Sequence, residues 1–279
     1  MQRYQCAHLQ GVSPEAFRRQ LEAFKELHDA GMEDFKDPSK QRDMSVRFQW
    51  GHHHDFGDFQ LEGPLKERHI WLLQTFIDEF QEMPLDLSGQ RVLDVGCWTG
   101  GTSLLLCAMG AEVVAIEEVR KYADAVRYLK KAFGLDRLQV EAMSLFDIPT
   151  FADRERFDYV LYAGVLSHVT DPILSFRILF NAMKDGGKCL VETATVKSRD
   201  SILTYGGPTA VKSGSASEMN RSGWNWFLPS PSTLKQMMLD VGFGPVLQNG
   251  ITKHRAFAVG TRKIQVDMMR GGLSVRSMP

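Results

Sequence analysis

The chain has 279 residues, of which 43% are hydrophobic and 24% are charged. This length supports one large domain with a substantial core, or one domain with a small appended piece. The formal net charge is −1, whereas proteins that wrap a long nucleic-acid backbone usually carry a basic surplus. A small-molecule substrate is therefore favoured, and a nucleic-acid substrate is disfavoured but stays open.

The four cysteines are scattered and form no CxxC pair: Cys6, Cys97, Cys107 and Cys189. This arrangement argues against a disulfide framework and a zinc site, and it fits a reducing cytoplasm. The first residues contain no long apolar run, so we expect no secretory signal. No apolar stretch approaches the roughly 20 residues that a membrane span needs. A cytoplasmic location without membrane contact is the expectation.

Residues 1–85 are predicted to form an N-terminal cap of helices and aromatic side chains. Ser13 and Pro14 are typical of a helix start, and apolar residues follow at helical spacing: Phe17, Leu21, Phe24 and Leu27. A second helix is expected over residues 64–80. The ring-rich stretch between these helices shows no clean strand.

From Arg91 onward, short apolar runs alternate with amphipathic helices. The predicted strands cover residues 92–95, 112–116, 138–142, 159–162 and 188–196, followed by a closing hairpin at 245–248 and 256–259. Helices are expected around residues 104–106 and over 122–133, 171–183 and 231–241. This alternation predicts an α/β, Rossmann-like fold, with a doubly wound, seven-stranded, mostly parallel sheet whose last strand is antiparallel.

The α/β domain is expected to span residues 86–265. A lid insertion at 197–230 interrupts the alternation, and we interpret it as a long ordered loop over the site. Residues 266–279 form a loose tail in this interpretation.

One glycine-rich segment ends the first strand of the domain and opens a helix. Gly96 and Gly100 let backbone amides approach a ligand closely, and the helix N-terminus adds a positive end. Nucleotide sites of this geometry carry an acidic residue about 20 positions later that binds a ribose. Here Glu117 ends the second strand, and its carboxylate can accept hydrogen bonds from both ribose hydroxyls.

The type of nucleotide is indicated by two residues of the same segment. A dinucleotide fingerprint needs G-x-G-x-x-G, but Trp98 occupies the position of the middle glycine. Asp94, at the strand tip, would repel a pyrophosphate but can hold an ammonium group. S-Adenosylmethionine carries an ammonium and a sulfonium, so the pattern favours this cofactor over NAD. The alternative is an ordinary strand-to-helix turn without a ligand.

Several stretches resemble class I S-adenosylmethionine-dependent methyltransferases. DVGCWTGG, VVAIE and FDYVLYAGVLSHVTDP resemble the first, second and fourth strands of that class. WGHHHDFGD, GVLSHVTDP and GWNWFLPSPSTLKQMMLDVGF resemble segments of the CmoB-like, tRNA wobble-uridine carboxymethyltransferase-like group. The resemblance runs from about residue 48 to residue 262.

This resemblance implies where the cofactor would bind. Asp94, Gly96 and Gly100 would surround the methionine end, and Glu117 would hold the ribose. The other implied pocket residues are Ser144 and Leu145 at the adenine, Ala163 and Gly164 beside the sulfonium, and Cys97, Trp98 and Glu118 in the adjoining loops.

The chain departs from the CmoB-like pattern in ways that bear on the transferred group. Trp98 replaces a glycine, and Ser167 stands where the group has a tyrosine that helps to hold the extra carboxylate of carboxy-S-adenosylmethionine. Arg255 matches a basic residue with the same task, but the group's lysine ahead of the fold has no match. The group's long tRNA-associated N-terminal region is also largely absent. Ordinary S-adenosylmethionine and a small acceptor are therefore favoured.

Catalytic candidates follow the fourth and fifth strands. In methyl transfer an enzyme mainly positions the nucleophile, and a general base is needed only where the nucleophile must lose a proton. His168 could be that base, or a structural histidine bonded to a backbone carbonyl. Glu192, beside an apolar run, is costly to bury unless it is paired or functional, so it is a candidate for substrate or cofactor contact.

The histidine run and the lid supply further candidates. Consecutive histidines do not easily face one ion, so no metal is expected at His52–His54. His54 and Asp55 either face the substrate or belong to a polar loop. Four lid residues could exclude water or stack on the sulfonium, or could pin the lid to the core: Tyr205, Trp224, Asn225 and Trp226.

The leading functional prediction is transfer of a methyl group from S-adenosylmethionine to a small-molecule acceptor, on O, N or S. One alternative is an internal displacement within the cofactor that releases methylthioadenosine. A second is tRNA modification by methyl or carboxymethyl transfer, which predicts a basic face near Arg199, Lys212 and Arg221. A third is a cofactor-binding module without turnover.

Overall fold

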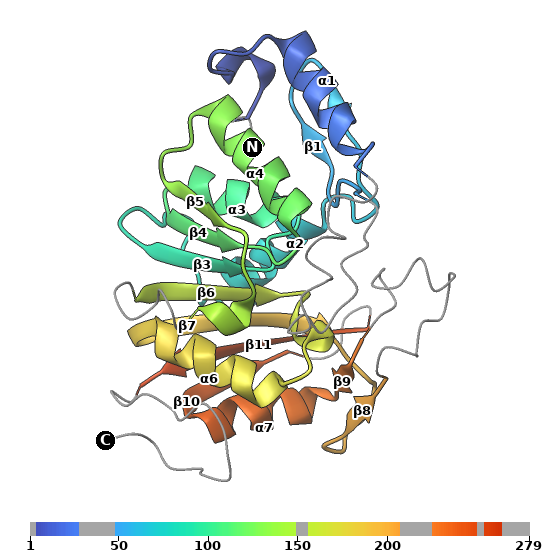
Figure 1. The fold of residues 1–279 in the computed structure, drawn as a ribbon. Helices are drawn as coiled ribbons and strands as arrows, with labels where there is room; N and C mark the ends of the chain where they lie inside the picture. Colours follow the sequence, from blue (N-terminus) through green and yellow to red (C-terminus); the bar gives the residue numbers. More distant parts are fainter. Residues whose placement is uncertain (1–3, 28–47, 149–155, 207–224, 250–253, 264–279) are drawn as a thin grey trace.

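The centre of the molecule is a seven-stranded sheet (Figure 1) with the strand order β10-β11-β7-β6-β3-β4-β5. The computed structural model describes residues 4–27, 48–148, 156–206, 225–249 and 254–263. The strands are β3 (Arg91–Val95), β4 (Glu112–Ile116), β5 (Leu138–Glu141), β6 (Phe157–Ala163), β7 (Met183–Ala194), β10 (Phe243–Gln248) and β11 (Arg255–Arg262). Strands β3 to β7 run parallel, whereas β11 is antiparallel to both β7 and β10. The predicted α/β sheet, with its antiparallel last strand, is confirmed.

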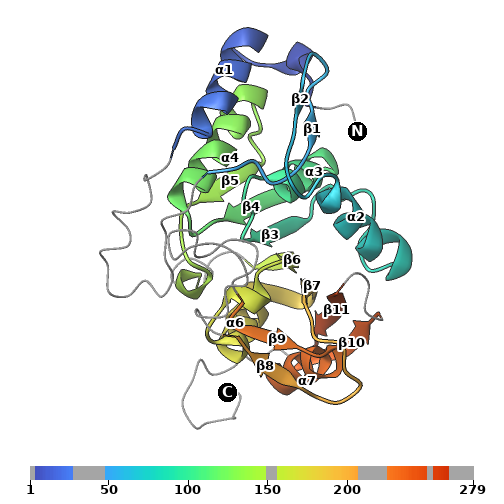
Figure 2. The same cartoon turned by 90° about the vertical axis from the view of Figure 1, so that its right-hand side faces the viewer.

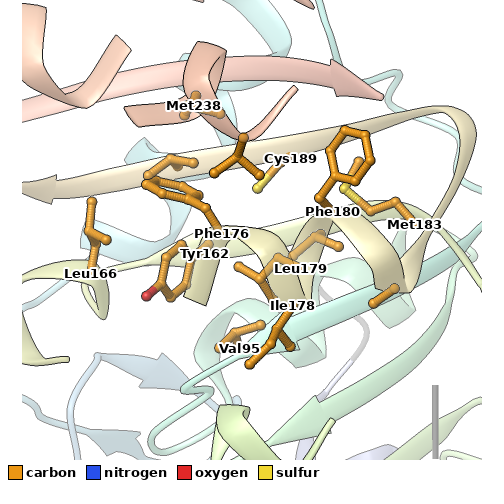
Figure 3. Packing of buried hydrophobic residues seen from close by; sticks show 14 of the residues in the cluster. Val95, Tyr162, Leu166, Phe176, Ile178, Leu179, Phe180, Met183, Cys189 and Met238 are labelled. Atoms are coloured by element: carbon orange, nitrogen blue, oxygen red, sulfur yellow. The ribbon is translucent and has the colours of Figure 1, made fainter. Parts of the chain in front are cut away.

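Helices cover both faces of this sheet (Figures 1 and 2). One face carries α6 (Pro172–Ala182) and α7 (Pro231–Val241), and the other carries α2 (Arg68–Gln74), α3 (Gly101–Ala108) and α4 (Arg120–Phe133). Successive strand residues point to opposite faces, so Leu93 and Val95 join the first core while Val92 joins the second. Figure 3 shows Val95 in the first core with Phe176 and Leu179 of α6.

The cap packs on α4 through a third, largely aromatic core. Helix α1 (Pro14–Phe24) begins where predicted, because Ser13 Oγ accepts the N–H of Ala16 at 3.3 Å. Phe17 and Leu21 are fully buried, and the Phe17 ring lies 5.4 Å from that of Phe133. The part of the cap that precedes α2 therefore rests on a helix beside the glycine-rich loop, whereas α2 packs on the sheet (Figure 1).

The second predicted helix is shorter than expected. Lys66 has a φ of 47°, a left-handed conformation that cannot continue into a right-handed helix. Helix α2 therefore begins at Arg68 instead of residue 64, and it ends in a π-helical turn over Thr75–Glu79.

Two short ribbons were also not predicted. In the cap, β1 (His54–Asp55) pairs with β2 (Gln60–Leu61), and in the lid β8 (Leu203–Tyr205) pairs antiparallel with β9 (Phe227–Pro229). The lid is thus partly a strand pair and not only a loop. Strands of two or three residues are too short to give an alternating pattern.

Across the ranges that the structure describes, no helix has the length and apolar character needed to span a membrane.

Candidate functional site

The loop that follows β3 is held against the end of β4. Gly96 and Cys97 donate their N–H groups to the carbonyl oxygen of Ile116, at 2.9 and 3.1 Å. Gly96 and Gly100 have φ values of 69° and 80°, a conformation that glycine adopts without strain. The backbone can therefore turn directly from β3 into α3, which brings the α3 N-terminus to the carboxyl edge of the sheet.

Asp94 is tied to the first turn of α3. Its Oδ2 accepts hydrogen bonds from Thr102 Oγ1 and Ser103 Oγ, both at 2.6 Å, and the residue is 3% exposed. Burial raises the pKa of the Asp94 carboxyl, although the two hydroxyl donors oppose this shift. Within the described ranges, its Oδ1 has no hydrogen-bond partner. Asp94 thus fixes the start of α3 through one oxygen, and a ligand contact of the other oxygen stays a prediction.

Glu117, at the end of β4, is oriented by two backbone amides. Its Oε2 accepts the N–H of Trp98 and its Oε1 accepts that of Val119, each at 2.9 Å. A carboxylate has more lone pairs than these two bonds use, so Glu117 can also accept from a ligand's hydroxyls. Asp94 is in register with Ala115 on the neighbouring strand, two positions before Glu117. The two predicted carboxylates therefore lie at neighbouring strand ends around one loop.

The Trp98 side chain packs into the cap. Its ring lies edge-on to the rings of His52 and Tyr122, at centroid distances of 5.8 and 6.1 Å. A Cβ on Gly51 would lie 2.4 Å from the Trp98 ring, so position 51 has room only for glycine. The N–H of Gly51 donates to Thr99 Oγ1 at 3.0 Å. The tryptophan that replaces the middle glycine therefore joins the loop to the cap.

Three histidines cluster beside this contact: His52 and His69 are buried, and His54 is half-buried. The His69 ring lies 4.5 Å from that of His52 and 5.6 Å from that of His54. Burial lowers the pKa of His52 to about 2, of His54 to about 3 and of His69 to about 4. His54, whose ring stacks on Phe56, is therefore a poor proton acceptor at neutral pH. Over the described ranges, no three His, Cys, Asp or Glu side chains are arranged to hold a metal ion.

The neighbouring candidate Asp55 has a local role. It is exposed, and its Oδ1 accepts the N–H of Gly57 at 2.9 Å within the β1–β2 turn. This bond stabilises the turn and does not direct Asp55 toward the glycine-rich loop.

Glu192, near the end of β7, binds two arginines that are far apart in the sequence. Arg68 Nη2 lies 2.7 Å from Glu192 Oε1, and Arg255 Nη2 lies 2.8 Å from Oε2. Arg255 Nε also donates to Oε1. Glu192 is 1% exposed, so its burial is explained by this pairing. Sequence reasoning missed Arg68, because it is one of several charged residues at the start of a helix and nothing local marks it.

The backbone after β6 is open on the side of this cluster. Gly164 has a φ of 73° and donates its N–H to the carbonyl of Glu192 at 2.8 Å. Among the residues that the structure describes, a Cβ on Gly164 would have one neighbour within 4 Å, Arg255 Nη2 at 3.9 Å. Ala163, half-buried, precedes it as the last residue of β6. A bound group can therefore approach the chain closely at this point.

The turn that follows carries one of the catalytic candidates. His168 is half-buried and ends a 3-10 turn over Leu166–His168. Ser167, in the same turn, is 1% exposed, and its Oγ has no partner in the part of the chain that the structure describes. The lid is tethered here, because Trp226 donates its N–H to the Ser167 carbonyl at 2.8 Å.

The other lid residues are less enclosed. The Tyr205 ring lies 6.4 Å from that of Trp226, and Tyr205 is 64% exposed. Asn225 is half-buried, and Trp224 lies outside the described residues. A lid role therefore stays a prediction for these residues.

The loop after β5 lies against Glu117. The N–H of Met143 donates to the Glu117 carbonyl at 3.1 Å, and Ser144 and Leu145 follow directly. Leu145 is buried, and Ser144 Oγ accepts the N–H of Phe146 at 3.4 Å. The predicted adenine-flanking pair thus directly follows a residue that is hydrogen-bonded to the backbone of the predicted ribose-binding residue.

The two remaining candidates for the cofactor pocket, Cys97 and Glu118, have different surroundings. Cys97 is buried, and burial raises the pKa of its thiol well above the usual range, so the side chain stays neutral. Glu118 is half-buried beside Glu117.

These features suit S-adenosylmethionine. Asp94 Oδ1 and the Glu117 carboxylate are acceptors for an ammonium and for hydroxyl groups, which matches the donors of this molecule. Gly164 leaves the backbone open where a Cβ would otherwise stand, and the buried Ser167 Oγ still lacks a partner within the described ranges.

Known proteins agree with this assignment. The family described as "Methyltransferase domain" matches residues 67–248, well over half of the chain. A tRNA U34 carboxymethyltransferase of Desulfotalea psychrophila is 26% identical over 57% of this chain and 46% of its own length. A ubiquinone biosynthesis O-methyltransferase of Cereibacter sphaeroides is 25% identical over 78% of this chain and 87% of its own length. The chain spans about half the length of the carboxymethyltransferases that it matches.

The fold is shared with solved structures at low identity. The N-terminal domain of EvdMO1, solved in the presence of SAH and D-fucose, has a TM-score of 0.60 and 16% identity, covering 92% of this chain and 99% of that one. The family match over residues 67–248, which is well over half of the chain, leads to one conclusion: this chain belongs to the S-adenosylmethionine-dependent methyltransferase domain family.

Proposed function

We propose that this chain transfers the methyl group of S-adenosylmethionine to a small-molecule acceptor at an oxygen, nitrogen or sulfur atom. One observation carries the proposal: Asp94 and Glu117 lie at neighbouring strand ends around a loop of positive-φ glycines. The ubiquinone biosynthesis O-methyltransferase, which this chain matches over most of both lengths, supports a small acceptor.

In this proposal each residue contacts a different part of S-adenosylmethionine. Asp94 Oδ1 accepts from the ammonium, Glu117 accepts from the ribose hydroxyls, and Ser144 and Leu145 flank the adenine. When bound, S-adenosylmethionine supplies an electrophilic methyl group on its sulfonium. The open backbone at Gly164 lets the acceptor approach from the side of β6.

Orientation of the acceptor then matters more than its activation. Glu192 is engaged by two guanidiniums, so it does not serve as the general base. Where the acceptor must lose a proton, we assign that task to His168. The backbone of Trp226 is bonded to the Ser167 carbonyl, and its ring helps to keep water away from the reacting atoms.

Isothermal titration with S-adenosylmethionine tests the role of Glu117. We expect Glu117→Gln to bind at least about tenfold more weakly, a loss of about 1.4 kcal/mol, because the neutral amide is a weaker acceptor for two hydroxyls. The matched control is Glu112→Gln, an exposed change at the opposite end of the same strand, which should bind as the wild type does. Equal affinities for both variants would remove Glu117 from its proposed role.

Mass spectrometry of the cofactor products separates the reaction types. After incubation with S-adenosylmethionine and metabolite extracts, adenosylhomocysteine together with a methylated acceptor supports the proposal. Methylthioadenosine would indicate internal displacement instead. Tight binding without any product would indicate a binding module.

Transfer to tRNA is a second candidate, because tRNA U34 carboxymethyltransferases match part of the chain. The predicted basic face includes Arg199, which is exposed, whereas Lys212 and Arg221 lie outside the described residues. Affinity for tRNA that falls steeply between about 50 and 200 mM salt would favour this candidate. Weak binding without salt dependence would leave the small acceptor as the substrate.

A further inference from the structure

Arg68, Glu192 and Arg255 form a charge cluster that cofactor binding, as proposed above, does not use. They come from the start of α2, the end of β7 and the start of β11. Arg255 Nη2 would lie 3.9 Å from a Cβ on Gly164, and the Glu192 carbonyl accepts the Gly164 N–H. The cluster therefore lies directly beside the open backbone after β6.

The cluster carries an excess positive charge. Two guanidiniums face one carboxylate, and in the described part of the chain Glu192 is the one carboxylate in contact with either arginine. Burial lowers the pKa of Arg68 and so does the neighbouring Arg255, while Glu192 raises it. Arginine nevertheless stays protonated in proteins, so the cluster has a net charge of about +1.

The exposed fractions of the three side chains show which side of the cluster is closer to solvent. Glu192 is 1% exposed and closes the inner side, whereas the side chains of Arg68 and Arg255 are 28% and 17% exposed. Each guanidinium has more N–H donors than it uses on Glu192. In the described ranges the hydrogen bonds of both guanidiniums go to Glu192, so spare donors remain to which a planar anion can bind in a bidentate manner.

We propose that Arg68 and Arg255 together bind a carboxylate group of the acceptor, so that the methyl acceptor of this chain is a carboxylic acid. This inference rests on the proposed methyl transfer and specifies its substrate class. Glu192 is a positioning residue, because it holds both guanidiniums in place and reduces their charge to one that a single carboxylate neutralises. A neutral amide of the same shape cannot replace the acid, because it offers one acceptor oxygen and no charge.

The test compares carboxylic acids with their primary amides on the full chain saturated with adenosylhomocysteine, so that no turnover occurs. The probes are phenylacetate and phenylacetamide, 4-hydroxybenzoate and 4-hydroxybenzamide, and butyrate and butyramide, measured by ligand-observed NMR titration. We expect at least one acid to bind at least tenfold more tightly than its amide. If no pair shows this preference, including the case in which no probe binds, the inference is wrong.

Variants of the two arginines test whether the preference for acids over amides depends on this cluster. Arg68→Gln and Arg255→Gln should each lose the preference for the acid, while their affinity for adenosylhomocysteine stays within about twofold of the wild type. The control is Arg127→Gln, in an exposed α4 ion pair with Asp124, which should keep the preference. An acid preference that survives in both cluster variants would make the cluster a purely structural link between α2 and the sheet. If neither variant folds, the wild-type acid and amide affinities still decide the matter.

Two further measurements separate this inference from the proposed function. Adenosylhomocysteine binding is measured first, and its absence would defeat both. Binding of adenosylhomocysteine without any preference for acids would defeat the inference alone. Carboxy-S-adenosylmethionine is titrated as well: if Arg255→Gln weakens its binding tenfold while acid binding is unchanged, the carboxylate belongs to the cofactor and the assignment to the acceptor fails.

Discussion

Trp98 shows how one residue can be both strained and useful. Its φ of 50° is a left-handed conformation that costs a residue other than glycine about 1–2 kcal/mol. Edge-on contacts with His52 and Tyr122 and the close fit against Gly51 offset that cost. The loop that we propose to bind the cofactor is therefore held partly by the cap.

The fit between Gly51 and Trp98 can be measured as a double-mutant cycle. Gly51→Ala should lower the free energy of unfolding by about 2 kcal/mol, because the new Cβ overlaps the indole ring. In a Trp98→Gly background the same change should cost less than about 0.5 kcal/mol, since the ring is gone. Urea unfolding of the four proteins gives the coupling, and additive costs would show that the two residues do not meet.

At the scale of single residues, the sequence predicted where the two carboxylates lie but did not predict every contact around the candidate site. Asp94 and Glu117 were predicted because each lies at the end of an apolar strand and their spacing is local. Arg68, one of the two arginines that bind Glu192, was not predicted, because it lies 124 positions away and no local pattern encodes that separation.

Ser230 connects two elements, the lid ribbon and α7. As N-cap of α7 its Oγ accepts the N–H of Thr233 at 3.3 Å, and it also accepts that of Ile202 at 3.1 Å. The same hydroxyl donates to the Asp200 carbonyl at 2.7 Å, and the residue is fully buried. One hydroxyl therefore holds the helix start and the segment that leads into β8.

Removing the two helix caps should have unequal effects. Ser230→Ala is expected to lower the free energy of unfolding by about 2 kcal/mol, because it leaves buried backbone groups without partners. Ser13→Ala removes a single bond at the exposed start of α1 and should cost less than about 1 kcal/mol. Thermal or urea unfolding compares them, and equal losses would contradict the connecting role of Ser230.

At the scale of helices and strands, the length of an element decided whether the sequence could predict it. The strands of the central sheet are apolar runs between recognisable helices, so their order was visible in the chain. Strands β8 and β9 hold three residues each and pair across more than twenty positions. Their hydrogen bonds depend on where the sheet places the two segments.

At the scale of the whole molecule, the cap carries a cluster of neutral histidines where it contacts the glycine-rich loop. His52, His54 and His69 have pKa values of about 2, 3 and 4 in the folded protein, against an ordinary value of 6.5. Unfolding exposes them to water and restores the ordinary value. Below pH 6.5 the unfolded chain therefore binds protons that the folded chain excludes.

This linkage predicts that stability falls as the pH is lowered. The free energy of unfolding should be highest near pH 7.5 and should drop by about 1.4 kcal/mol per histidine, or about 4 kcal/mol in all, by about pH 5.5. Urea unfolding at several pH values measures the slope, and His69→Gln should reduce it by about a third. A protein that is equally or more stable at the lower pH would show that the histidines are not buried as neutral groups.

The sequence by itself determined the order of strands and helices, the glycine-rich turn and the two carboxylates beside it. These depend on periodicity and on spacings within about 25 residues, which a chain displays before it folds. The tertiary structure alone decided that Arg68 and Arg255 share Glu192, that Trp98 fits against Gly51 and that three histidines cluster within the cap. Those contacts follow from the spatial order of the strands in the sheet and from the way the helices pack on it. Local sequence patterns encode neither of these arrangements.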